Sequence, residues 1–277
     1  NARALEKAAG LPADVLLLDL EDAVAPEAKV SARDAVCDAV TARPYGRREV
    51  VVRINGLESE WGRADLDAAV TAGADAILAP KVGCGEDVAR LEEAMTRAGA
   101  SGEMALWAMI ETPLAILNLP EIARCRGSSR LDALVIGTND LAKEMRVRPD
   151  PQRQCFLPAL TMTVLAARAF GLATIDGVFN DIGNEQGLAE EARQGRQLGF
   201  DGKTLIHPSQ LETANRVFSP TADELRDARA VIAAFDLPEN RGKGVIKVDG
   251  RMTELLHLEQ ARDLVAMDAA ITALGSQ

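Results

Sequence analysis

The chain has 277 residues, of which 47% are hydrophobic and 26% are charged. This composition is typical of a globular protein with a sizeable core, and the length falls within the usual size of a single α/β barrel domain. The net charge of −11 and the pI near 4.8 disfavour nucleic acid and membranes as partners, because non-specific binding to either requires a positive field.

Short apolar segments alternate with longer amphipathic or alanine-rich segments, which is the pattern of parallel strands joined by helices. The predicted strands are residues 14–20, 50–54, 75–80, 104–110, 131–137, 173–178 and 203–206. Helices are predicted between them, for example after Pro26 and after Thr112 and Pro113, where a threonine cap and an early proline are typical helix starts. We expect a (β/α)8 TIM barrel.

The predicted elements at both ends of the chain differ from those of a standard (β/α)8 barrel. Such a barrel has eight strands, and residues 2–9 already read as a helix, so we infer that the first strand precedes Asn1 and is missing from this chain. After the last strand, two helices are predicted on either side of residues 237–250, which contain several glycines and lysines. We therefore predict a barrel domain at residues 1–219 and a C-terminal helical arm or lid at residues 220–277.

The four cysteines lie far apart and form no C-x-x-C pair, which disfavours a zinc site and a disulfide framework. No apolar run approaches the length of a membrane span, and the first residues contain no signal-peptide core. We expect a cytoplasmic protein.

Polar residues follow several predicted strands, at the end where a (β/α)8 barrel carries its active site. These residues are Asp19, Glu21, Asp22, Arg53, Asn55, Lys81, Glu111, Asn139 and Asp140. Side chains alternate along a strand with a period of two, so Asp19 and Glu21 share one face, and that face can look into the barrel mouth.

Glu111 and Asp140 follow consecutive strands and are the candidate metal ligands. Neighbouring strands lie about 4.8 Å apart, so carboxylates at their ends can converge on one cation. Oxygen ligands with no histidine or cysteine nearby favour Mg²⁺, or Mn²⁺, over zinc. Glu21 and Asp22 would bind the waters that Mg²⁺ keeps. The alternative is that such carboxylates only cap helices, as Asp140 could before the segment LAKEM.

Several motifs, in this order, resemble one protein family. They are LLLDLEDAVAPEAK, VVRINGLESEWGRADL, ILAPKV, MIETPLAILN, GTNDLAKEM and GFDGKTLIHPSQL. They resemble the CoA-ester lyase branch of the HpcH/HpaI aldolase and citrate lyase β-subunit family. Within that branch, WGRADL, GTNDLAKE and VDGRMTELLH are most similar to the malyl-CoA lyase and malyl-CoA thioesterase group.

The resemblance implies a (β/α)8 barrel, Mg²⁺ held by Glu111 of the MIET motif and Asp140 of the GTNDL motif, and a homotrimer or hexamer. It also implies that the strand before Asn1 carries an R-S-x-L-x-x-P-G motif whose arginine belongs to the active site. For Arg53, both the resemblance and its charge suggest bidentate binding of the carboxylate of a 2-oxo acid such as glyoxylate. The alternative for Arg53 is an ion pair with Glu21 or Asp19.

Further substrate contacts are expected from Lys81 and from backbone N–H groups around Asn139 and Leu141, which could hold a carboxylate. A Schiff-base role for Lys81 would require a metal-independent aldolase, and the metal motifs favour a structural or phosphate-facing role instead.

The implied reaction is cleavage of a 3-hydroxyacyl-CoA dicarboxylate, such as malyl-CoA or citramalyl-CoA, to an acyl-CoA and a 2-oxo acid. In similar lyases, the base is an aspartate of a C-terminal G-x-M-I-D motif from a neighbouring subunit, and GRMTE places Glu254 there. One extra methylene moves the carboxylate by about one bond length, which is enough to impair cleavage. The first alternative is therefore hydrolysis to malate and CoA, with Glu254 activating water. Otherwise Glu254 is only an acidic residue at a helix start.

A further alternative is a carrier-dependent subunit similar to citrate lyase β. A free CoA enzyme should need residues 244–275, whereas a carrier-dependent subunit should not need them.

Overall fold

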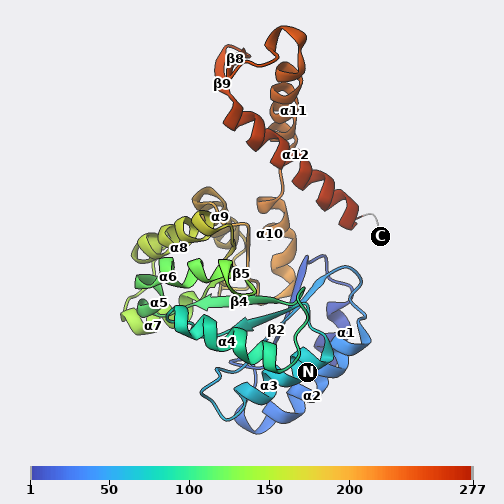
Figure 1. The fold of residues 1–277 in the computed structure, drawn as a ribbon, viewed down its shortest axis with the longest axis vertical. Coiled ribbons are helices and arrows are strands. Elements are labelled where there is room, and N and C mark those ends of the chain that lie inside the picture. The colour runs from blue at the N-terminus through green and yellow to red at the C-terminus, as the bar shows by residue number, and fades with distance from the viewer. Residues whose placement is uncertain (1, 276–277) are drawn as a thin grey trace. The chain divides into compact units, whose positions relative to one another are not determined.

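The structure is a computed structural model that describes residues 2–275 (Figure 1). The chain divides into two compact units, Asn1–Ala214 and Asn215–Gln277. The arm predicted at residues 220–277 lies wholly within the second unit.

The first unit is built on one parallel sheet whose strands follow the order of the chain. The strands are β1 (Val15–Asp19), β2 (Glu49–Arg53), β3 (Ala76–Ala79), β4 (Ala105–Ile110), β5 (Leu131–Ile136), β6 (Ala173–Asp176) and β7 (Gly202–Lys203). Each predicted strand is present, although the last is shorter than predicted. Within residues 2–275, β1 and β7 form the two edges of this sheet.

Helices connect consecutive strands, as parallel pairing requires, and one further helix precedes β1 and another follows β7 (Figure 1). They are α1 (Ala2–Ala8), α2 (Lys29–Ala42), α3 (Gly62–Ala72), α4 (Gly85–Arg97), α5 (Pro113–Leu117), α6 (Leu119–Arg124), α7 (Thr138–Met145), α8 (Leu157–Phe170), α9 (Glu185–Leu198) and α10 (Leu211–Phe218). At α5, the Thr112 hydroxyl accepts a hydrogen bond from the Ala115 N–H at 3.1 Å, and Pro113 begins the helix as predicted. This arrangement of strands and helices confirms the α/β barrel class.

The inner face of the sheet is apolar over most of its length. Its buried cluster consists of alternate residues from neighbouring strands, namely Val51, Ala76, Leu78, Trp107, Ala133 and Val135. Arg53 lies two residues beyond Val51 on the same face, and it is the direct partner of Asp19 in the register of β1 and β2. Glu111 lies four residues beyond Trp107. The face that packs the core therefore carries charged residues at its carboxyl end.

The second unit contains α11 (Ala222–Asp236), a hairpin of β8 (Val245–Val248) and β9 (Arg251–Glu254), and α12 (Leu255–Gly275). The hairpin turns at Asp249 and Gly250, which both have positive φ. Phe235, Ile246 and Leu258 form a small core of this unit. Leu258 of α12 packs within its own unit, because α11 and the hairpin supply its apolar partners.

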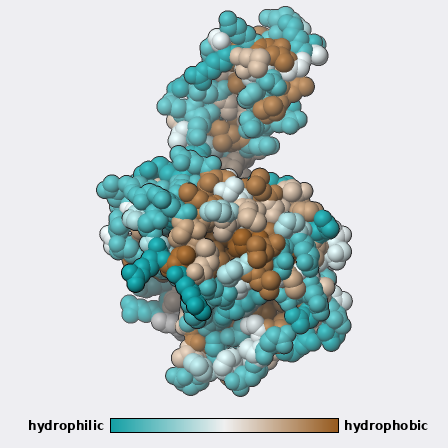
Figure 2. Space-filling view, turned by 90° about the vertical axis from the view of Figure 1, so that its left-hand side faces the viewer, coloured by the Kyte–Doolittle hydropathy of each residue, from teal (hydrophilic) through white to brown (hydrophobic). Residues whose placement is uncertain are grey.

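Large apolar side chains are also exposed on the surface of the first unit, and Figure 2 shows apolar residues gathered on one of its faces. On α5, α7 and α8 they are Leu114, Leu117, Met145, Met162 and Leu165. Among residues 2–275, no helix has both the length and the apolar character needed to cross a bilayer.

Candidate active site

Glu111 follows β4 directly and is the most buried carboxylate of the strand-end group, with 1% exposure. Its Oε1 accepts a hydrogen bond from the Lys81 N–H at 2.8 Å. Gly137 lies against the other side of the carboxylate, and a Cβ there would be 2.6 Å from Glu111 Oε2. A side chain at position 137 would therefore displace the Glu111 carboxylate, so glycine keeps this space open.

Burial raises the pKa of Glu111 to about 7, although the Lys81 N–H acts in the opposite direction. The negative charges of Glu21 and Asp140 raise this pKa further. Glu111 is thus a carboxylate whose ionised form is poorly compensated by the protein itself. A bound cation would supply the missing positive charge.

Asp140 lies in the first turn of α7, directly after β5. The Gly137 N–H donates to the Ile110 carbonyl at 3.0 Å, which holds the chain leading to Asp140 beside the chain leading to Glu111. The oxygen donors of Glu111 and Asp140 suit Mg²⁺, which takes one or two carboxylates and keeps several waters. Residues 2–275 contain no cluster of three or more histidine, cysteine, aspartate or glutamate side chains able to hold a metal.

Arg53 forms a bidentate ion pair with Asp19. Its Nε and Nη2 donate to the two carboxylate oxygens of Asp19 at 2.7 and 2.6 Å. Burial opposes ionisation of Asp19, but the hydrogen bonds and charge of Arg53 outweigh it and lower the pKa of Asp19 below its usual value. The ion pair considered as the alternative for Arg53 is therefore formed, and it occupies one edge of the guanidinium.

The remaining Nη1 of Arg53 lies 2.9 Å from Glu21 Oε2 and 3.5 Å from Asp22 Oδ2. The contact with Glu21 lacks hydrogen-bond geometry and is one of charge alone. Burial raises the pKa of Glu21, whereas the charge of Arg53 lowers it. Lys81 Nζ lies 3.7 Å from Glu21 Oε1. Arg53, Glu21, Asp22 and Lys81 therefore form one charged group beside Glu111.

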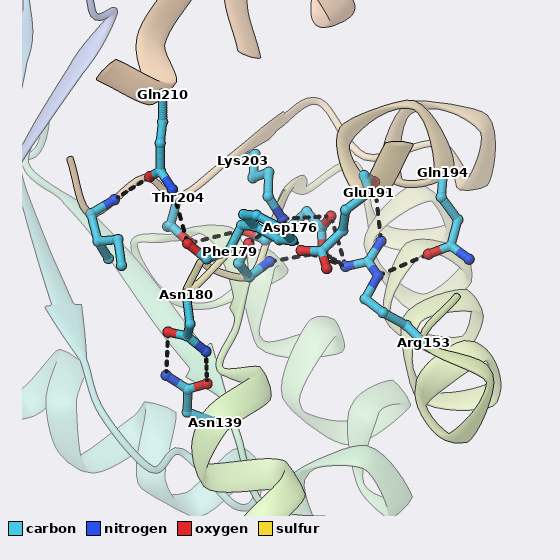
Figure 3. A network of polar contacts seen from close by, with 12 residues as sticks. Asn139, Arg153, Asp176, Phe179, Asn180, Glu191, Gln194, Lys203, Thr204 and Gln210 are labelled. Carbon is cyan, nitrogen blue, oxygen red and sulfur yellow. Dashed lines mark hydrogen bonds and ion pairs between the residues drawn. The ribbon is translucent and has the colours of Figure 1, made fainter. Parts of the chain in front are cut away.

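The side chain of Asn139 is engaged by hydrogen bonds within the protein. Its amide forms two reciprocal hydrogen bonds with the Asn180 amide, at 2.7 and 3.3 Å (Figure 3). The Leu141 N–H donates to the Gly137 carbonyl at 3.1 Å within the first turn of α7. Of the backbone groups expected to hold a carboxylate, those of Asn139 and Asp140 remain the candidates, because the first N–H groups of a helix have no partner within it.

Lys29 and Asp65 support the β1 and β2 strand ends, a role that the sequence did not suggest. Lys29 Nζ donates to the carbonyls of Leu20 and Glu21 and to Asn55 Oδ1, at 2.7 to 2.8 Å. Asn55 Nδ2 in turn donates to Asp65 Oδ2 at 2.6 Å. These buried contacts fix the backbone that carries Glu21.

A second buried network joins β6, β7, α9 and the loop before α8 (Figure 3). Arg153 Nη1 lies 2.7 Å from Asp176 Oδ1, and Lys203 Nζ lies 3.3 Å from Asp176 Oδ2 and 2.6 Å from Glu191 Oε1. The side chains of Asp176 and Lys203 have no exposure to solvent. The signal in the sequence was a charged residue within the apolar segment ATIDGV and another at the start of the segment KTLI.

A cavity of about 460 Å³ adjoins the charged group. It is lined by Glu21, Asp22, Val24, Pro26, Lys29, Asn55, Gly56, Ser59, Trp61, Pro80 and Lys81. Trp61 thus supplies an aromatic wall of this cavity.

The sequence matches a known protein family over the part of the chain that forms the parallel sheet. The model of the family described as HpcH/HpaI aldolase/citrate lyase matches residues 1–208. The chain belongs to this family. This confirms the resemblance drawn from the motifs.

Relatives of this HpcH/HpaI family member extend over almost the whole chain. (3S)-malyl-CoA thioesterase of Cereibacter sphaeroides (strain ATCC 17025 / ATH 2.4.3) is 47% identical over 99% of the chain and 93% of the relative. Citrate lyase subunit beta of Escherichia coli (strain K12) is 36% identical over 95% of the chain and 88% of the relative. The structure of CitE from Mycobacterium tuberculosis with magnesium, acetoacetate and coenzyme A has a TM-score of 0.78 and 28% identity, covering 97% of this chain and 94% of that one.

In this family member, Glu254 is the last residue of β9 in the second unit. Its N–H donates to His257 Nδ1 at 3.0 Å, at the start of α12. The Glu254 side chain is half-buried. Its role as a base stays a prediction.

Proposed function

We propose that the protein is a Mg²⁺-dependent enzyme that acts on a malyl-CoA-type thioester. The observation that carries this proposal is the buried Glu111 carboxylate, whose pKa is raised by burial and further by the negative charge of Asp140 at the end of the neighbouring strand. The magnesium and coenzyme A in the CitE structure from Mycobacterium tuberculosis support it.

Glu111 and Asp140 would hold Mg²⁺, which when bound supplies an electrophile that polarises oxygens of the substrate. The Asn139 and Asp140 N–H groups would hold the substrate carboxylate at the N-terminus of α7. Arg53 has its Nε/Nη2 edge engaged by Asp19, so its contact with a 2-oxo acid or malyl carboxylate would use Nη1 and replace Glu21 or Asp22.

We place hydrolysis to malate and CoA first, and cleavage to an acyl-CoA and glyoxylate second. Identities of 47% and 49% to (3S)-malyl-CoA thioesterases favour hydrolysis. Glu254, where the lyases have aspartate, favours it as well. The motifs alone favour cleavage only through the family as a whole, because they do not distinguish the two reactions.

Product analysis separates these reactions. The full chain is incubated with malyl-CoA and Mg²⁺, and the products are identified by chromatography and mass spectrometry. We expect malate and free CoA, with no turnover when EDTA removes the cation. Glyoxylate with acetyl-CoA would instead assign the lyase reaction, and full activity in EDTA would contradict the metal mechanism.

Glu254→Asp should shift the products toward glyoxylate. A shorter carboxylate at this position restores the lyase-like residue, and a displacement of about 1 Å can change a rate by ~100-fold, so we expect the ratio of glyoxylate to malate to rise at least tenfold. Glu259→Asp, on the exposed surface of α12, is the matched control and should leave the ratio unchanged. An equal ratio in Glu254→Asp and the wild type would mean that Glu254 does not steer the reaction.

The assembly of the protein belongs to the same proposal. A homotrimer or hexamer, with Glu254 reaching the site of an adjacent subunit, and a cytoplasmic location remain predictions. A carrier-dependent role similar to the citrate lyase β subunit would be indicated if removal of residues 244–275 left activity on a carrier-bound acyl group intact.

A further inference from the structure

Lys81 has an unusual backbone for its residue type. It follows β3 and Pro80 in a turn, and its φ is +53°. Arg43 and Arg146 have similar values because they end helices, Arg153 immediately precedes a short helix, and Asp249 turns a hairpin, but Lys81 has none of these roles. The second position of such a turn normally favours glycine or asparagine, because other side chains are strained at positive φ.

The positive φ of Lys81 is tied to the direction of its N–H. In a turn of this kind, changing the second central residue from positive to negative φ accompanies a flip of the peptide between the two central residues. Here that peptide joins Pro80 to Lys81. In the present orientation the Lys81 N–H donates to Glu111 Oε1 at 2.8 Å. The flipped peptide would turn the Pro80 carbonyl toward this carboxylate and remove the donor.

The hydrogen bond and Gly137 together fix the orientation of the Glu111 carboxylate. The Lys81 N–H holds Oε1 from one side, and Oε2 packs against the position of Gly137 on the other. The side chain of Lys81 makes a weaker contact. It is 54% exposed, and its Nζ is 3.7 Å from Glu21 Oε1, so its charge is well screened by solvent.

We propose that Lys81 is a positioning residue for Glu111 that acts through its main-chain N–H, held by the left-handed turn, and that its ammonium group is not required for cation binding. This inference rests on the proposed Mg²⁺ site. It differs from the expected contact of the Lys81 side chain with substrate, because it assigns the role to the backbone.

The test is titration of Mg²⁺ into the full-length protein without substrate, followed by calorimetry. Lys81→Gly and Lys81→Asn lose the charge but tolerate positive φ, and we expect dissociation constants within about threefold of the wild type. Lys81→Val loses the same charge but opposes positive φ, and we expect binding at least about tenfold weaker than in Lys81→Gly. Circular dichroism verifies that each variant is folded.

Arg43→Gly and Arg43→Val form the matched control pair. Arg43 also has positive φ but ends α2, and its side chain bonds to Gly73 and Asp75 away from the charged group. These variants should differ in stability and bind Mg²⁺ equally. Equal affinities of Lys81→Gly and Lys81→Val would overturn the inference, and so would weak binding by both, which would assign the role to the ammonium. Failure of the wild type to bind Mg²⁺ would overturn the proposed function and the inference together.

Discussion

Glu111→Gln is expected to abolish Mg²⁺ binding and to lower turnover of a malyl-CoA-type thioester by roughly 10²–10³-fold or more. The amide keeps the shape of the side chain but removes the negative charge that a divalent cation needs. Because the Glu111 carboxylate is buried beside Gly137, no neighbouring water-exposed carboxylate can take its place without a change in the backbone. Calorimetry and steady-state kinetics on the purified variant measure the two effects separately.

Glu103→Gln is the control for this experiment. Glu103 is exposed and precedes β4 at the end of the strand opposite to Glu111. The same change of charge there should leave both Mg²⁺ affinity and turnover at the wild-type values. Wild-type Mg²⁺ affinity in Glu111→Gln would show that the cation binds elsewhere.

Asp176→Asn is expected to destabilise the first unit by about 3–5 kcal/mol, because it removes a negative charge from a buried network in which Arg153 and Lys203 share the carboxylates of Asp176 and Glu191. The close approach of Gly195 makes relief by rearrangement difficult, since even a Cβ there would lie 2.6 Å from Asp176 Oδ2. At about 2–4 °C per kcal/mol, the melting temperature should fall by roughly 6–20 °C, as measured by calorimetry.

Asp132→Asn provides the comparison with an exposed ion pair. Arg126 and Asp132 are 43% and 50% exposed, and such pairs contribute about 0–1 kcal/mol. The melting temperature should therefore change little. If both variants shift it equally, the network around Asp176 has no special role in stability.

Local pattern and strand geometry were sufficient to predict the barrel and to select the candidate site residues. Apolar segments of strand length alternate with helices, and parallel strands bring all their carboxyl ends to one edge of the sheet. Glu111 and Asp140 could therefore be paired from their positions alone. The period of two along each strand likewise predicted that Asp19 faces the barrel mouth, where it meets Arg53.

Only the tertiary structure decided which partner each of these side chains binds. The partners are distant in the chain, and their contacts depend on strand register and loop conformation, which a local sequence pattern does not specify. The register of β1 and β2 sets Asp19 opposite Arg53, which engages one edge of the guanidinium. The left-handed turn at Lys81 brings its N–H to Glu111, and Asn180 occupies the amide of Asn139. Arg153, Asp176, Glu191 and Lys203 are separated along the chain, and only folding brings them into one buried network, where low solvent access makes their pairing obligatory.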